Sequence, residues 1–150
     1  INEKWLTRRH FQMNSELAKI YNSLPRIQCK GLCIDQCSVA PCVPAEADHL
    51  MERYGRIPLP VGIEGKGLVC AELSEEGRCS IYEDRPLICR MYGLVRAMKC
   101  PHGCIPHGGF MSYRKGQKIL DRAKRIPGKH EPLKILEDRL DELKREKENK

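Results

Sequence analysis

Residues 70–93, CAELSEEGRCSIYEDRPLICRMYG, constrain the fold of this chain more than any other feature. They hold three cysteines, with eight and then nine residues between them. Residues 76–77 predict a turn, residues 79–82 a short strand, and residues 83–86 a second turn. Each turn brings a cysteine back toward the same place, and such convergence is typical of a metal centre. The cysteines expected to converge are Cys70, Cys79 and Cys89.

Pro86 stands three residues before Cys89, and its fixed φ angle favours a helical turn that presents Cys89, Arg90 and Tyr92. Arg90 follows Cys89 directly, so we expect its guanidinium to favour the thiolate, the form that binds metals. The alternative is that these cysteines are small buried hydrophobic residues without chemistry, as free cysteines often are.

Two further groups of cysteines flank this stretch. In the first, three successive cysteines and then a fourth are separated by three, three and four residues, and Gly31 favours a loop that wraps a common centre. The last pair is separated by three residues within a Pro/Gly turn. His102 and His107 are lesser candidates, and His49 is expected to be solvated. The predicted metal ligands are Cys29, Cys33, Cys37, Cys70, Cys79, Cys89, Cys100 and Cys104.

The number of cysteines and the scarcity of aromatic residues both favour a metal. Nine is an odd number, which argues against a closed disulfide framework, and aromatic side chains make up only 5% of the chain. A core so poor in large side chains gains stability from bound metal. No apolar run approaches the roughly 18 residues of a membrane span, and no secretory signal is evident. We therefore expect a cytoplasmic protein without a membrane partner.

Charge divides the chain into three parts. Residues 29–110 hold all nine cysteines and carry 9 Lys and Arg against 10 Asp and Glu. Residues 1–28 carry 5 basic residues against 2 acidic ones, and residues 111–150 carry 13 against 8. The predicted parts are an N-terminal helix, a cysteine-cluster metal-binding domain and a basic C-terminal helical segment. The basic flanks suit a nucleic acid or an acidic protein, although a solvated surface explains them equally well.

Hydrophobic spacing and caps predict four longer helices. They cover residues 2–24, which Pro25 ends, then 44–54, ended by Gly55, then 112–125, and a last one from Pro132. A further helix is expected to continue from Arg90 through residues 94–98, while residues 56–69 are expected to be loop with short extended pieces. The last helix carries a heptad-like seam, for which packing on the domain is preferred to docking on a partner. The seam consists of Leu133, Leu136, Leu140 and Leu143. The expected fold is a small α-rich, irregular, metal-stabilised domain, with helices flanking a loop-rich cysteine-cluster core with short strands.

The cysteine blocks resemble the YkgJ-type cysteine-cluster family, described as zinc- or iron-chelating proteins. The family's first block ends in adjacent cysteines, whereas Ser-Val-Ala-Pro separates Cys37 from Cys42 here, so Cys42 is left out of the ligand set. The likeness spans about residues 29–104 and implies metal binding more firmly than any reaction. Its second block has the pattern Cys…Leu…Gly-x-Cys-x-Ile-Tyr-x-x-Arg-Pro-x-x-Cys-Arg, which is matched by Cys70, Leu73, Gly77, Cys79, Ile81, Tyr82, Arg85, Pro86, Cys89 and Arg90.

The spacing of the cysteines favours an iron–sulfur cluster over zinc. Zinc sites commonly use C-x2-C pairs, and the sequence contains none. Iron–sulfur clusters take four thiolates from varied spacings, so a 4Fe–4S cluster is the expected cofactor and zinc the alternative.

Three classes of function follow. The first is a redox-sensitive binding or regulatory module whose basic helices contact a protein or a nucleic acid. The second is a zinc- or iron-chelating, metal-handling protein. The third is a protein-modifying enzyme, since some members of the family resemble flagellin lysine methylases. The sequence shows no Gly-rich nucleotide loop and no Ser/His/Asp set to support an enzyme, which places this class last.

Overall fold

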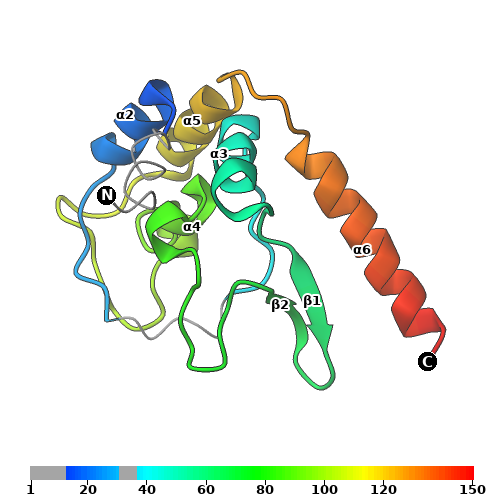
Figure 1. Cartoon of the computed structure of the whole chain (residues 1–150). Coiled ribbons are helices and arrows are strands. Elements are labelled where there is room, and N and C mark those ends of the chain that lie inside the picture. Colours follow the sequence, from blue (N-terminus) through cyan, green and yellow to red (C-terminus); the bar gives the residue numbers. More distant parts are fainter. Residues whose placement is uncertain (1–12, 31–36) are drawn as a thin grey trace, which may run out of the picture.

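Helices supply most of the regular structure in the computed structural model, which describes residues 13–30 and 37–150 (Figure 1). Within that part, the molecule is a small helix-rich domain with a single two-stranded sheet. Trp5, Cys33 and the first half of the helix predicted over residues 2–24 lie outside the described residues. The α-helices are α2 (Ser15–Ser23), α3 (Pro44–Tyr54), α4 (Leu87–Met91), α5 (Tyr113–Lys124) and α6 (Pro132–Glu148). The strands are β1 (Pro60–Ile63) and β2 (Gly67–Cys70), and two 3₁₀ helices are η2 (Tyr82–Asp84) and η3 (Arg96–Met98).

Helix α3 forms where the sequence predicts it, because both of its ends carry strong local signals. Pro44 occupies the first turn, where its missing N–H costs nothing, and Glu46 accepts a hydrogen bond from the Val43 N–H at 3.0 Å. Gly55 ends the helix with a φ of 71°, which glycine adopts without strain. The prediction for residues 44–54 is confirmed.

Helix α5 lies at the centre of the larger apolar core and contacts α2, α3 and α4. Leu17 and Ile20 from α2, with Leu87 and Met91 from α4, are almost fully buried in this core. Gly116 lets α5 approach α4, since an added Cβ would lie 3.0 Å from Val95 and 3.1 Å from Met91. The predicted helices over residues 2–24 and 112–125 are therefore confirmed within the described residues.

A second, smaller apolar cluster joins α3 to the chain that follows it, to residues 79–81 and to α6. Cys42, Leu50, Ile57 and Ile81 are buried in it, and Ile135 of α6 packs against it. Strands β1 and β2 pair antiparallel, with Pro60 opposite Cys70 and Ile63 opposite Gly67. The extended pieces expected in residues 56–69 are thus a hairpin, and α6 runs beside it along one side of the molecule (Figure 1).

Two local predictions are wrong. Residues 79–82 do not form a strand: Cys79 makes an isolated bridge with Leu73, and the chain then turns into η2. The helix from Arg90 does not extend through residues 94–98, because α4 ends at Met91 and Val95 instead pairs with Met111 in a parallel bridge. In both places contacts with distant residues outweigh the local preference.

The turn at residues 76–77 is confirmed by a hydrogen bond from the Gly77 N–H to the Ser74 carbonyl at 3.0 Å. The helical turn after Pro86 is also confirmed, with Cys89 and Arg90 inside α4 and Tyr92 just beyond it. None of the helices in residues 13–30 and 37–150 combines the length and the apolar character that crossing a bilayer requires.

Candidate metal centre

Five cysteines from four segments approach one another beside α3. We call them the thiol cluster: Cys37, Cys42, Cys70, Cys79 and Cys89. Cys42 directly precedes the N-cap of α3, Cys70 ends β2, and Cys89 lies in α4. The backbone joins two of these segments, since the Cys70 N–H donates to the Cys37 carbonyl at 3.1 Å.

The thiols are near enough to influence one another electrostatically. Burial, and after it negative charge on Cys70, Cys37 or Cys79, raises the pKa of Cys89 to about 12. Burial likewise raises the pKa of Cys42, to which Glu46, Cys89 and Cys70 add. These thiols are therefore protonated at neutral pH in the metal-free chain, and a cation that binds them must displace protons.

Glu46 is a buried carboxyl group that links three helices next to the thiol cluster. It is 2% exposed, and it accepts hydrogen bonds from the Tyr21 hydroxyl and from the Leu87 N–H, the latter at 2.5 Å. Burial raises its pKa, although these hydrogen bonds and the charge of Arg90 oppose the rise. By holding the first turn of α4, Glu46 helps to fix the position of Cys89.

Asp84 fixes the other side of the segment that carries Cys89. Its carboxylate is hydrogen-bonded to the Tyr54 hydroxyl at 2.5 Å and to His49 Nε2 at 2.9 Å, and it forms an ion pair with Arg53 Nη1 at 2.8 Å. All three partners belong to α3, so η2 is tied to that helix. His49 is about 10% exposed at its side chain and binds a carboxylate, so the prediction that it is solvated is wrong.

Glu72 supports the turn between Cys70 and Cys79. Arg56 donates to it from Nε at 2.7 Å and from Nη2 at 2.9 Å, which is the bidentate arrangement that arginine forms with carboxylates. The Ser80 hydroxyl also donates to Glu72, and its backbone N–H donates to the Glu72 carbonyl. These hydrogen bonds therefore hold in place the loop that carries Cys70 and Cys79.

Arg90 does not activate Cys89 as the sequence suggested. Its guanidinium donates from Nε to the Arg85 carbonyl at 2.9 Å and from Nη2 to the Glu83 carbonyl at 2.7 Å, and it lies 4.0 Å from the centre of the Tyr21 ring. The pKa of Cys89 is raised, not lowered, because burial dominates. The predicted activation by Arg90 is therefore wrong for the metal-free chain.

Of the other candidate cysteines that the structure describes, Cys100 and Cys104 form a pair of their own. Cys100 interacts with Cys104 and accepts a hydrogen bond from the His102 N–H at 3.4 Å, and these contacts with the charge of Lys30 lower its pKa. Cys104 is buried and Cys29 is exposed. Nε2 of His102 is buried and has no hydrogen-bond partner among the described residues. The structure thus brings four predicted ligands together and adds Cys42, which the gap after Cys37 had caused us to omit.

The donor set suits a thiolate-bound metal, although its present spacing is wider than chelation needs. Across residues 13–30 and 37–150, no three His, Cys, Asp or Glu side chains are arranged to hold a metal ion. The chemistry of the thiol cluster nevertheless fits the soft ligands preferred by iron–sulfur clusters and zinc. A competing interpretation also has support, because Cys42 and Cys79 pack in the smaller apolar cluster as small hydrophobic residues do.

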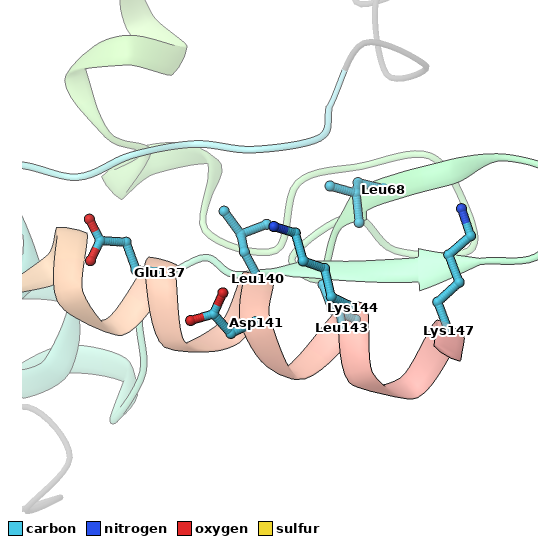
Figure 2. A pocket seen from close by; sticks show the side chains of 7 residues that line it. All are labelled: Leu68, Glu137, Leu140, Asp141, Leu143, Lys144 and Lys147. Atoms are coloured by element: carbon cyan, nitrogen blue, oxygen red, sulfur yellow. The ribbon is translucent and has the colours of Figure 1, made fainter. Parts of the chain in front are cut away.

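The basic C-terminal segment forms two different surfaces. On α5, Lys115, Lys118 and Arg122 are exposed, and the structure gives them no ion pair within its described part. On α6, a groove of about 490 Å³ lies against the hairpin, with Leu140, Leu143 and Leu68 at its apolar centre (Figure 2). Leu133 is 57% exposed, so the predicted leucine seam does not pack as one stripe.

Comparison with protein-family models, curated proteins and solved structures gives no match for this chain. The resemblance to the YkgJ-type family therefore stays a prediction.

Proposed function

We propose that the protein holds a 4Fe–4S cluster on the thiol cluster and acts as a redox-sensitive binding module. The observation that carries the proposal is the environment of Cys89, whose thiol has those of Cys37, Cys70, Cys79 and Cys42 as electrostatic neighbours. Such a cluster needs four ligands, and thiols from separate segments would supply them here. Hydrogen bonds hold the loops that carry these thiols in place.

The cluster, when bound, supplies a group that gains or loses an electron and that oxidants degrade. The chain's own residues would hold it and shape its surroundings. Glu46 and Asp84 keep the segment of Cys89 against α3, while Glu72 keeps Cys70 and Cys79 on one loop. Such supporting hydrogen bonds influence metal affinity and reduction potential in known sites.

The module's partner surface is proposed to be the basic face of α5. Its exposed residues Lys115, Lys118 and Arg122 lie outside residues 29–110, which hold the cysteines, so they can meet phosphates or an acidic protein without disturbing the thiols. A zinc- or iron-handling protein is the alternative function, since it would use the same thiols and need no such partner.

The test is anaerobic purification of the full chain, with iron, zinc and sulfide measured per chain and an absorption spectrum recorded. We expect iron and sulfide in similar amounts, and a visible band that bleaches in air. Cys89→Ser and Cys79→Ser should each lose most of the metal. Cys104→Ser is the matched control, because that thiol is buried but lies outside the thiol cluster.

Other outcomes separate the alternatives. Zinc without sulfide would favour the metal-handling function, and loss of metal in Cys104→Ser would add the last cysteine pair to the ligand set. Full metal content in both Cys79→Ser and Cys89→Ser, or no metal in the unmodified chain, would sink the proposal and leave the cysteines as buried hydrophobic residues.

A further inference from the structure

A pocket of about 430 Å³ is lined by the end of α2, by the chain after it, and by residues of α4 and of the chain on either side of α4. Three arginines, Arg26, Arg85 and Arg90, line this pocket, and Asn22 adds an amide. Of the described residues that line it, none is acidic. Three guanidinium groups around one cavity repel one another, and an anion between them would remove that repulsion.

Two of the arginines are held in place by contacts within the chain. Arg90 uses Nε and Nη2 on the Arg85 and Glu83 carbonyls and lies 4.0 Å from the centre of the Tyr21 ring. Arg85 uses Nη1 on the Tyr82 carbonyl at 2.9 Å and stacks 4.1 Å from the Tyr82 ring centre, which leaves Nε and Nη2. Both side chains are ordered before a ligand arrives, which lowers the entropic cost of binding.

Arg26 supplies the third arginine, from the chain that follows α2. Its carbonyl accepts a hydrogen bond from the His107 N–H at 2.8 Å, so its backbone is anchored. Its exposed guanidinium has no hydrogen bond or ion pair with any part of the chain that the structure describes. Glu46 interacts electrostatically with Arg90, but it is 2% exposed, accepts a hydrogen bond from the Tyr21 hydroxyl and does not line the pocket.

The number of donors indicates the chemical class of the ligand. One carboxylate has two oxygens and is satisfied by one bidentate guanidinium, whereas a phosphate monoester has three terminal oxygens and two negative charges. Leu24, Ile27 and Leu94 supply an apolar wall, and the volume falls within the roughly 300–1,000 Å³ typical of small-molecule sites. We propose that this pocket binds the phosphate group of a phosphorylated small molecule.

This site is separate from the proposed metal centre, because no cysteine lines it among the described residues. The proposal can therefore fail or succeed without deciding whether the thiol cluster binds metal. Metal content measured on the same samples would show that the two questions remain distinct.

The test is isothermal titration calorimetry on the full reduced chain, with inorganic phosphate, pyrophosphate and acetate as probes. We expect one saturable site for phosphate or pyrophosphate, and no comparable binding of acetate. Arg26→Ala should weaken binding roughly tenfold, as the loss of a charge-assisted hydrogen bond does. Arg85→Ala should do the same, and the metal content of both variants should stay unchanged.

Arg114→Ala is the matched control, since Arg114 is an exposed arginine on α5 outside the pocket. An unchanged affinity in that variant would exclude general attraction to a basic protein. The proposal is overturned by no saturable binding at about 10 mM probe, where even a Kd of 1 mM would be apparent. It is overturned equally by acetate binding as tightly as phosphate, or by the same loss of affinity in Arg114→Ala and Arg26→Ala.

Discussion

Asp84 has almost no exposed surface, and α3 supplies all three of its side-chain partners. Burial alone would raise the pKa of Asp84, but hydrogen bonds from Tyr54 and His49 and the charge of Arg53 outweigh it and lower the pKa. A carboxyl group whose pKa falls on folding stabilises the native state above its unfolded pKa of 3.8. That contribution is lost as the pH decreases from there toward the folded pKa.

We therefore expect Asp84→Asn to lower the free energy of unfolding by about 2 kcal/mol at pH 7, because it leaves charged and hydroxyl donors with a weaker acceptor. The loss should shrink below pH 4, because the carboxyl group of the unfolded chain then binds a proton that the native carboxylate does not. Urea unfolding at pH 7 and pH 3 measures both effects. Asp138→Asn is the control, since its pair with Lys134 is exposed and the substitution should change stability far less than Asp84→Asn does. Equal losses at the two pH values would contradict the assigned role of the carboxylate.

Single residues show where sequence reasoning stopped. The convergence of Cys70, Cys79 and Cys89 could be predicted, because turns between them are encoded locally. Cys42 was missed, although its place two residues before Pro44, the first residue of α3, was a usable signal. The orientation of Arg90 could not be predicted either, because its ring partner, Tyr21, is 69 positions away in the chain and only tertiary packing brings them together.

Elements with strong caps were predicted well, and those set by distant contacts were not. Helix α3 matches its prediction because proline, a capping glutamate and glycine all lie within its own sequence. Residues 79–82 have the composition of a strand, yet the chain turns into η2. The contacts of Asp84 with His49, Arg53 and Tyr54 stabilise that turn. Helix α6 was predicted, but Ile135 contacts the core while Leu133, a seam residue, remains exposed.

Hydrogen bonds to Asp48 hold the connection between α5 and α6 against α3. Asp48 accepts hydrogen bonds from the Lys129 N–H at 2.8 Å and from His130 Nδ1 at 2.6 Å. An added Cβ at Gly128 would lie 2.5 Å from the carbonyl carbon of Pro44, a distance that real Cβ contacts do not show. Only glycine fits there without a shift of the backbone.

We expect Gly128→Ala to lower the free energy of unfolding by roughly 1–3 kcal/mol, because the backbone of Pro44 must move. Gly62→Ala is the matched control, since its Cβ would meet only the end of Leu143 at 3.9 Å and should change stability by less than about 1 kcal/mol. Chemical denaturation of both variants measures the difference. Equal stability of the two variants would show that the backbone of Pro44 shifts without lowering the free energy of unfolding.

The basic face of α5 makes a separate prediction about partners. If the partner is a nucleic acid, Lys118→Glu combined with Arg122→Glu should weaken binding and reduce the salt dependence, by about one unit of slope for each phosphate that the variant no longer neutralises. Helix content should be unchanged, since both side chains are exposed. Fluorescence anisotropy with a labelled oligonucleotide across a salt series measures this.

Truncation provides the contrast for a protein partner. Removing residues 132–150 deletes α6 and its groove but keeps the hydrogen bonds of Asp48 with Lys129 and His130. A nucleic-acid reader should survive this deletion, whereas a module that docks through α6 should not. Binding that persists in both the truncated and the charge-reversed chains would show that these basic surfaces are only solvated.

Residues 13–30 and 37–150 pack into two modest apolar cores, and the chain has few aromatic side chains, so we expect the proposed metal to contribute measurably to stability. Anaerobic reconstitution is expected to raise the melting temperature, by roughly 2–4 °C for each kcal/mol gained in a domain of this size. Cys89→Ser should melt at the same temperature with and without metal. Calorimetry of chelator-treated and reconstituted samples measures the shift, and identical melting of the unmodified chain in both states would contradict a structural role for metal.

Helix α3 also determines how freely Cys89 can move. Glu46 near one end of this helix holds the first turn of α4, and His49, Arg53 and Tyr54 farther along hold η2 through Asp84. Helix α3 holds residues 82–91 in place, so the backbone that carries the Cys89 thiol is already ordered. Little of that backbone would have to be ordered when an ion binds. Substitutions at His49 or Tyr54 are then expected to alter affinity for a thiophilic ion without touching any of its ligands.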